Sequence, residues 1–381
     1  MTAPPDPPAP PADAMVADRC RRLARAAWLL ARAPVLLARG IGRRRAAPPA
    51  PTLVGRILVV RTDRMGDMAL TTGALVDLKR HFTHARITAL APPAPLALLE
   101  NHPAVDRLVP LTGKRLPHGM AGRFDLAIDF TPDERLFGAR LVGRSGAPWR
   151  IGFGRAAREV FFTLRGPQAR TDRHLVDLHR ELLRAIGVAD PAGEPALVVT
   201  PPERAAAMAR LAALGAAAPR VLVHPGAHEE SQRWAPEQYA ETIARLTERA
   251  GAACLVAAGP GEEGLARRIA DLTPDALALG TLSVRELMAV MSACHLFVGN
   301  NSGPLHVAAA LGVPTVSVSG PTDPRRFAPR GGEHRVLRLD LSCSPCQRGR
   351  CWHHTCLRGI DADPVIAAAV EILAVARPRA A

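Results

Sequence analysis

Lysine and aromatic residues are scarce in this chain of 381 residues. Only Lys79 and Lys114 are lysines, so arginine supplies almost all of the basic charge behind the formal net charge of +14. Because alanine and proline are also abundant, this excess fits a coding bias, and the charge is weak support for an anionic partner. Aromatic residues make up 4% of the chain, and no basic segment with interleaved aromatics is present. We therefore predict no nucleic-acid partner.

Long apolar runs are also missing. The longest candidate, "AAWLLARAPVLLARG", is interrupted by Arg32 and Pro34 and is shorter than the roughly 18 to 20 residues that span a bilayer. We expect no transmembrane helix. With 48% apolar and 22% charged residues, the chain can form two packed domains without disulfide or metal support. The strand-like surroundings of Cys254 and Cys294 predict buried thiols in a reducing compartment.

The N-terminal 53 residues are predicted to form an extension outside the folded part. Residues 1–13 are rich in proline and alanine and cannot bury enough apolar surface to fold. Residues 14–45 carry nine arginines against one acid, Asp18, with Leu23, Ala27 and Leu30 at helical spacing. This segment is typical of a helix that lies on an anionic membrane surface. A solvated or cleaved leader and an organelle transit peptide are the alternatives.

Strand and helix patterns alternate through the rest of the chain. "GRILVVR", "ARITALAPP", "VDRLVPL" and "FDLAIDFT" read as strands in residues 54–200, and Leu75, Leu78 and Phe82 have the spacing of an amphipathic helix. The alternation restarts at residues 201–342, from "RVLVHPG" to "PTVSVSG". It predicts two doubly wound α/β domains, followed at 343–381 by a cysteine-rich loop and a helix. Ligands of such sheets bind beyond the carboxyl ends of the strands.

One strand-to-helix joint predicts a phosphate site. In "LFVGNNSGPLHVAAALG", the strand is followed by a loop of small residues, and Pro304 stands near the first helical turn. Free N–H groups and the helix dipole at such a start bind phosphate. The loop residues are Gly299, Asn300, Asn301, Ser302 and Gly303. A simple capped turn is the alternative, because glycine and asparagine are common in turns.

Two further joints carry candidate ligand-binding side chains. His224, Pro225 and Gly226 end one strand, and Gln232 and Arg233 follow in its loop. The guanidinium of Arg233 is suited to bind a diphosphate with two hydrogen bonds, unless it is a solvated loop arginine. At the third joint, "AAGPGEEGLARR", Glu262 is placed to accept from a ribose hydroxyl or to compensate a helix dipole.

With these joints in view, three blocks of the chain resemble a known family. "VVRTDRMGDMALTTGAL", "VLVHPGAHEESQRW" and the long block from "LSVRELMAVMSACHLFVGNN" to "GPTDPRRFAP" are similar to glycosyltransferase family 9, the ADP-heptose:lipopolysaccharide heptosyltransferases. The resemblance implies a GT-B fold, with two Rossmann-like domains facing a central cleft. It also implies a bacterial, inverting, metal-independent enzyme. Such an enzyme moves a heptose or related sugar from an ADP-sugar to a lipid-linked core oligosaccharide, such as the lipopolysaccharide inner core.

The resemblance also assigns roles to residues. Asp67, which follows Met65 and Gly66, would be the general base, although an acid at a helix N-terminus is also an ordinary cap. Arg61, Asp63 and Arg64 would line the acceptor side of the cleft. The residues implied to bind substrates are Arg64, Met65, Gly66, His224, Pro225, Gly226, Gln232, Arg233, Glu262, Asn300, Asn301, Ser302, Gly303, His306, Thr322 and Asp323.

Two positions depart from the family pattern. Gln232 stands where the family has lysine, and Asn301 stands where it has aspartate. The paired loss of one positive and one negative charge is either compensatory or a sign of a different sugar donor. A non-catalytic, membrane-associated protein that binds nucleotide sugars is the alternative function, and the retention of Asp67 argues against it. The expected location is cytoplasmic and peripheral, on the inner face of the plasma membrane.

The segment "CSPCQRGRCWHHTC" raises the question of a metal. Cys343 and Cys346 have the spacing of a zinc-binding pair, while Cys351 and Cys356 follow more closely than a second zinc pair usually does. A structural zinc, a disulfide pair and unbonded packing thiols all stay open. No cofactor is expected for catalysis.

Overall fold

The computed structural model describes residues 27, 45, 47–133, 135–154 and 156–376. Its backbone clusters into two compact units. The first unit holds most of the chain up to Gly193, and the second holds Arg64–Thr72, Ala97–His102 and everything from Glu194 onward. The membrane-surface prediction for residues 14–45 falls almost wholly outside the described residues. Among the helices described, none combines the length and hydropathy that crossing a bilayer requires.

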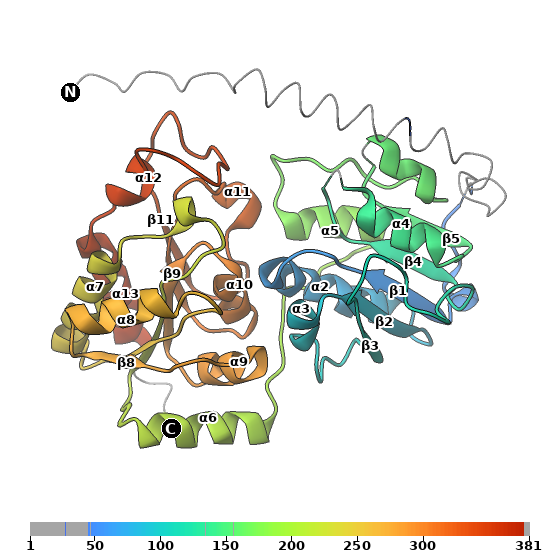
Figure 1. The fold of residues 1–381 in the computed structure, drawn as a ribbon. Coiled ribbons are helices and arrows are strands. Elements are labelled where there is room, and N and C mark those ends of the chain that lie inside the picture. The colour runs from blue at the N-terminus through green and yellow to red at the C-terminus, as the bar shows by residue number, and fades with distance from the viewer. Residues whose placement is uncertain (1–26, 28–44, 46, 134, 155, 377–381) are drawn as a thin grey trace. The chain divides into compact units, whose positions relative to one another are not determined.

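The first unit is built on a parallel five-stranded sheet (Figure 1). Its strands are β1 (Arg56–Val60), β2 (Arg86–Ala91), β3 (Arg107–Pro110), β4 (Leu126–Asp129) and β5 (Trp149–Gly152). The order is β3-β2-β1-β4-β5, so the chain places β2 and β3 on one side of β1 and, after β3, crosses to place β4 and β5 on the other side. The carboxyl ends of β1 and β4 therefore meet at a topological switch point, where sheets of this kind bind ligands.

Helices and short 3-10 turns connect these strands. They are η1 (Pro51–Leu53), α2 (Met65–His81), α3 (Pro93–Ala97), α4 (Leu136–Arg144), η2 (Ala156–Phe161) and α5 (Leu175–Arg184). α4 buries Leu141 and Val142 in a core shared with Leu58 and Val60 of β1. α5 starts at His174, whose ring accepts a hydrogen bond from the Val176 N–H at 3.2 Å. These contacts fix the helices that follow β4 and β5.

The second unit is built on a parallel six-stranded sheet. Its strands are β6 (Arg220–His224), β7 (Ala253–Val256), β8 (Ala276–Ala278), β9 (Leu296–Asn300), β10 (Thr315–Val318) and β11 (His334–Leu337). In the order β11-β10-β9-β6-β7-β8, the switch point lies between β6 and β9. Two of the three joints that predict ligand-binding side chains lie in the loops after these two strands, and the third follows β7.

The helices of the second unit have clear sequence signals. They are α6 (Pro201–Ala213), η3 (Glu230–Gln232), α7 (Pro236–Ala250), α8 (Glu263–Leu272), α9 (Val284–Ser292), α10 (Gly303–Ala310), α11 (Pro324–Phe327), α12 (Thr355–Arg358) and α13 (Ala362–Ala376). Ser283 and Glu286 form a capping box at α9, and Gly251 ends α7 in the left-handed conformation at φ 62°. α13 packs against α7 and buries Val365 and Ile366 in the core of this unit.

Two doubly wound sheets confirm the predicted α/β fold class. The predicted strands of both sheets are present, but β5, β8 and β11 were not predicted. All three are short edge strands. The side chains of β8 and β11 are half-buried or exposed, so these two strands lack the apolar run that signals an inner strand. Cys254 and Cys294 are buried as predicted, and burial raises the pKa of each thiol to about 12.

Candidate functional site

The loops after β6 and β9 are tied together by one buried amide. Asn300, at the end of β9, has no exposed surface. Its Nδ2 donates to the Pro225 carbonyl at 2.7 Å, and its Oδ1 accepts from the Trp234 N–H at 3.0 Å. The sequence placed Asn300 among the ligand-binding residues, whereas the structure uses its side chain to hold the loop that carries Gly226 and Arg233. Asn300 therefore shapes the site through the backbone.

Glu262 and Arg233 meet at the same edge of the sheet. Arg233 Nη2 lies 3.2 Å from Glu262 Oε1, and Arg233 Nε donates to the Ala227 carbonyl at 2.9 Å. Glu262 Oε2 accepts from the Gly259 N–H at 3.2 Å. Separate ligand roles were predicted for the two side chains, whereas their ion pair was not. The pair places a positive and a negative group side by side at this edge of the sheet.

Gly226 is required by the position of Glu262. A Cβ on Gly226 would lie 1.8 Å from Glu262 Oε2, which is far inside van der Waals contact. His224, two residues earlier, is buried, and burial lowers the pKa of its imidazole. His224 is therefore uncharged at neutral pH, and Arg233 is the cation that this loop offers to an anionic ligand.

The start of α10 fits an anion. No acidic residue stands in its first turn, and Asn301, just before the N-cap residue, is also uncharged. Asn301 Nδ2 donates to the Phe327 carbonyl at 3.3 Å, so its side chain fastens α11. Ser302, the N-cap residue, has a buried Oγ without a hydrogen-bond partner among the described residues. Gly303 and the buried His306 complete this turn. The positive end of the helix dipole is thus left uncompensated by any carboxylate of that turn.

Gln232 and Thr322 also come together. Gln232 Nε2 donates to Thr322 Oγ1 at 3.2 Å, which links the loop after β6 to the loop after β10. Asp323 caps α11 and pairs with Arg325, with Nη2 and Oδ2 2.9 Å apart. The hydrogen bond from Arg325 lowers the pKa of the Asp323 carboxyl. The Asp323 carboxylate is therefore already engaged within the protein.

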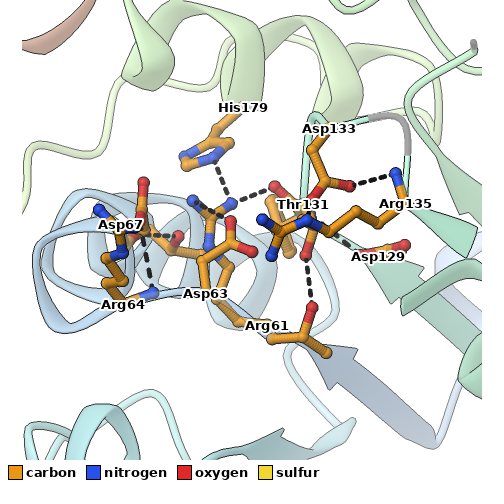
Figure 2. A network of polar contacts seen from close by, with 12 residues as sticks. Arg61, Asp63, Arg64, Asp67, Asp129, Thr131, Asp133, Arg135 and His179 are labelled. Atoms are coloured by element: carbon orange, nitrogen blue, oxygen red, sulfur yellow. Dashed lines mark hydrogen bonds and ion pairs between the residues drawn. The ribbon is translucent and has the colours of Figure 1, made fainter. Parts of the chain in front are cut away.

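Asp67 lies in the first turn of α2, as the sequence predicts. Its Oδ2 accepts a long hydrogen bond of 3.4 Å from the Arg64 N–H (Figure 2). This contact gives Asp67 the capping role that was the alternative to catalysis. The side chain is half-buried, Arg64 is exposed, and Met65 and Gly66 begin the helix beside them.

Arg61 does not line a cleft, and the prediction that it does so is wrong. Its side chain is completely buried and donates to the Phe130 carbonyl. Nη2 lies 3.3 Å from Asp63 Oδ2, and Nη1 lies 3.4 Å from His179 Nε2 (Figure 2). Arg61 and Asp63 therefore brace the loop that leads from β1 toward Asp67.

A second buried ion pair stands at the end of β4. Arg158 Nη2 lies 2.6 Å from Asp129 Oδ2, and both side chains are almost fully buried. Asp133 Oδ1 is 3.8 Å from Arg158 Nη1, and burial is the main cause that raises the pKa of Asp133. No local sequence pattern signals this pair, because its members are far apart in the chain.

A basic pocket in the first unit was also missed. The cavity of about 540 Å³ is lined by Lys114, Arg115, Phe137, Arg140 and Arg144. Phe137, Arg140 and Arg144 are three and four residues apart on α4 and share one face of the helix. Four cations around one aromatic ring suit an anionic ligand with an apolar or sugar face.

A family model decides the class of this protein. The model described as glycosyltransferase family 9 (heptosyltransferase) matches residues 114–356, more than half of the chain. The chain belongs to glycosyltransferase family 9. It is a glycosyltransferase with the two-sheet GT-B architecture of that family.

Individual members of family 9 are similar to this chain over different lengths. Lipopolysaccharide heptosyltransferase 1 of Pseudomonas aeruginosa is 27% identical over 321 residues, which cover 78% of this chain and 87% of that protein. Lipooligosaccharide heptosyltransferase 2 of Campylobacter jejuni is 34% identical over 94 residues, but these cover only 24% of this chain and 30% of that protein. The solved structure of the E. coli heptosyltransferase WaaC with ADP has a TM-score of 0.66 at 22% identity, covering 83% of this chain and 99% of that one.

The cysteine-rich segment of this family 9 member does not form a metal site in the described part of the chain. No group of three or more histidine, cysteine or acidic side chains has a metal-binding arrangement there. Cys343, Cys346, Cys351 and Cys356 are unbonded. Cys356 is buried, which raises the pKa of its thiol to about 11. Cys356 is thus a packing thiol, Cys346 is exposed, and the structural zinc stays a prediction.

Replacing Gly226 by alanine tests the role of the loop after β6. The new Cβ would displace Glu262 and break its contacts with Arg233 and the Gly259 N–H. We expect ADP affinity to fall by about 10- to 100-fold, the equivalent of one or two lost hydrogen bonds to a charged group. Isothermal titration with ADP measures the change. Gly264→Ala is the matched control, because nothing lies within 4 Å of the Cβ it adds. Equal affinity of both variants would remove this loop from the nucleotide site.

Proposed function

We propose that this family 9 member transfers a heptose, or a closely related sugar, from an ADP-sugar to a lipid-linked core oligosaccharide such as the lipopolysaccharide inner core. The observation that carries the proposal is the switch point between β6 and β9. There the side chain of Asn300, two residues before the N-cap of α10, holds the loop of Arg233, and no acidic residue stands in the first turn of that helix.

The donor would bind at this switch point through its diphosphate. Arg233 and the first-turn N–H groups of α10 supply positive charge to the phosphates, and Ser302 Oγ offers a further donor. Glu262 would accept from a ribose hydroxyl. The E. coli heptosyltransferase WaaC, which was solved with ADP, supports an adenine nucleotide.

The reaction would proceed with inversion and without a metal. Asp67 would take the proton from the acceptor hydroxyl while that oxygen attacks the anomeric carbon of the donor. The bond from this carbon to the diphosphate breaks, and the diphosphate leaves with the electron pair. Arg233 and the α10 dipole would stabilise the charge that develops on the leaving group, which is the task that a metal has in other transferases.

The acceptor would be acidic. The basic pocket of Lys114, Arg115, Arg140 and Arg144 supports a saccharide that carries carboxylate or phosphate groups. A lipid-linked acceptor also requires the enzyme to work at a membrane. We therefore propose a cytoplasmic, peripheral location on the inner face of the plasma membrane, with residues 14–45 on the anionic lipid surface.

The alternative function, nucleotide-sugar binding without turnover, is favoured by one observation. Gln232 pairs with Thr322, so a neutral contact stands where the family pattern has a lysine. This alternative predicts tight ADP-sugar binding with no transfer to any acceptor.

Turnover with a panel of nucleotide sugars tests the proposal. Purified full-length protein is given ADP-heptose, ADP-glucose, UDP-glucose or GDP-mannose with membrane-extracted acceptor, with and without EDTA. We expect the fastest transfer from ADP-heptose and the same rate in EDTA. Preference for another nucleotide sugar would refute the donor assignment, and a rate lost in EDTA and restored by Mg²⁺ would refute metal independence.

A further inference from the structure

Sugar transfer does not explain why one tryptophan side chain in the cysteine-rich segment is exposed to solvent. Trp352 is 90% exposed, the highest value among the large apolar side chains that the structure describes as exposed. By contrast, Trp234 is buried and Trp149 is half-buried under the Arg45 guanidinium. An indole gains free energy from leaving bulk water, so a fully exposed ring can contribute to binding where its neighbours also suit a partner surface.

The loop around Trp352 carries only positive charge. From Leu341 to Ile360 the chain has no aspartate or glutamate. Arg348, Arg350 and Arg358 are all exposed in the same stretch. An aromatic ring among arginines, without acids, matches the composition of segments that lie at the headgroup level of anionic membranes.

The loop is held in place although its tip is exposed. Ser344 is buried, and its Oγ donates to the Gly320 carbonyl at 2.8 Å. The Gln347 N–H donates to the Pro321 carbonyl at 2.7 Å, and Ser231 Oγ donates to the Arg348 carbonyl at 2.7 Å. On the other side, Leu357 lies in the core of the second unit. Trp352 is therefore presented to solvent by an anchored loop.

We propose that the loop Cys346–Cys356 is a membrane-contact element that inserts Trp352 into the headgroup region of an anionic bilayer. The arginines hold the loop at the lipid phosphates, while the indole ring reaches the boundary with the acyl chains. The choice of a lipid surface rests on the proposed lipid-linked acceptor. Because the loop is bonded to the loops of Ser231 and Gly320, it also joins the membrane contact to the donor side of the second unit.

Vesicle binding tests the proposal on the full-length chain. Vesicles of equal parts phosphatidylcholine and phosphatidylglycerol are compared with pure phosphatidylcholine by co-sedimentation. We expect Trp352→Ala to bind the anionic vesicles about 10-fold more weakly, because the buried apolar area of the ring is lost. Arg350→Gln should bind about 5-fold more weakly at low salt. Leu272→Ala, which truncates a side chain 49% exposed on α8, is the control and should bind like the wild type.

Quenching by brominated lipid locates the contact. In a Trp28→Phe background, brominated phosphatidylcholine mixed into the anionic vesicles should quench Trp352, and the additional Trp352→Phe change should abolish that quenching. Equal quenching with and without Trp352 would overturn the proposal. So would a self-association of the wild type that Trp352→Ala removes, or a Trp352 emission shift caused by ADP in the absence of vesicles.

The same variants separate this proposal from the proposed function. Trp352→Ala should keep the wild-type rate on a delipidated, water-soluble acceptor and lose rate only on an acceptor embedded in vesicles. If the wild type transfers to neither acceptor, the proposed function fails, while the vesicle and quenching results still decide the membrane contact.

Discussion

Replacement of Asp67 by asparagine is expected to lower kcat for sugar transfer by about 100- to 10,000-fold, the range that a general base contributes. ADP affinity should stay within about twofold, because the proposed diphosphate contacts come from Arg233 and α10. Steady-state kinetics and isothermal titration with ADP, made on the same preparation, measure the two quantities.

The Asp67→Asn change separates catalysis from capping. Asp67 Oδ2 accepts from the Arg64 N–H, and an asparagine Oδ1 can accept the same bond, so the start of α2 keeps its cap. The variant should therefore unfold at nearly the wild-type temperature. Asp172→Asn, an exposed carboxylate paired with Arg170, is the matched control and should keep full activity. Unchanged transfer by Asp67→Asn would leave Asp67 with the capping role alone.

Loss of the Arg158 charge is expected to give the largest effect on stability. Arg158 and Asp129 are both buried, so Arg158→Met leaves the Asp129 carboxylate without its partner in the protein interior. Breaking such a pair costs about 3 to 5 kcal/mol of unfolding free energy. Urea unfolding followed by circular dichroism measures the loss.

A double variant shows whether the loss comes from the unpaired charge. Asp129→Asn combined with Arg158→Met removes both charges, and it should be more stable than Arg158→Met alone. Arg170→Met breaks an exposed pair and serves as the control, with no measurable change expected. If Arg158→Met proved as stable as this control, the pair at the end of β4 would have no structural role.

Periodicity and turn residues were enough to predict most of the fold. The inner strands β1, β6 and β9 are continuous apolar runs bounded by charged or small residues, and they fold as predicted. The edge strands β5, β8 and β11 were not predicted. β5 has only four residues, and the half-exposed side chains of β8 and β11 resemble those of loops. An edge strand forms when its neighbour supplies the hydrogen bonds, and no local pattern records that.

The roles of the candidate site residues stay predictions, and the contacts among these residues were not predicted. The sequence marked Arg233 and Glu262 as separate ligand-binding side chains, 29 positions apart, and only the fold shows that they pair. Arg61 was misjudged for a related reason. A charged side chain is expected at a surface, yet the Phe130 carbonyl and the Asp63 carboxylate satisfy it in the interior.

The sequence holds a signal for one part of the basic pocket in the first unit. Phe137, Arg140 and Arg144 repeat at helical spacing, which indicates one helix face that carries two arginines. The contribution of Lys114 and Arg115 depends on the path of the loop after β3. Tertiary packing sets the path of such a loop, and no local sequence pattern records it.

Release of ADP from ADP-heptose distinguishes sugar transfer from binding without turnover. The full-length protein is incubated with ADP-heptose, with and without membrane-extracted acceptor, and both free ADP and heptose on the acceptor are counted. We predict that ADP appears only with acceptor, one molecule for each heptose transferred. ADP-heptose that binds but releases no ADP with any acceptor would contradict it and would support a protein that binds nucleotide sugars without turnover.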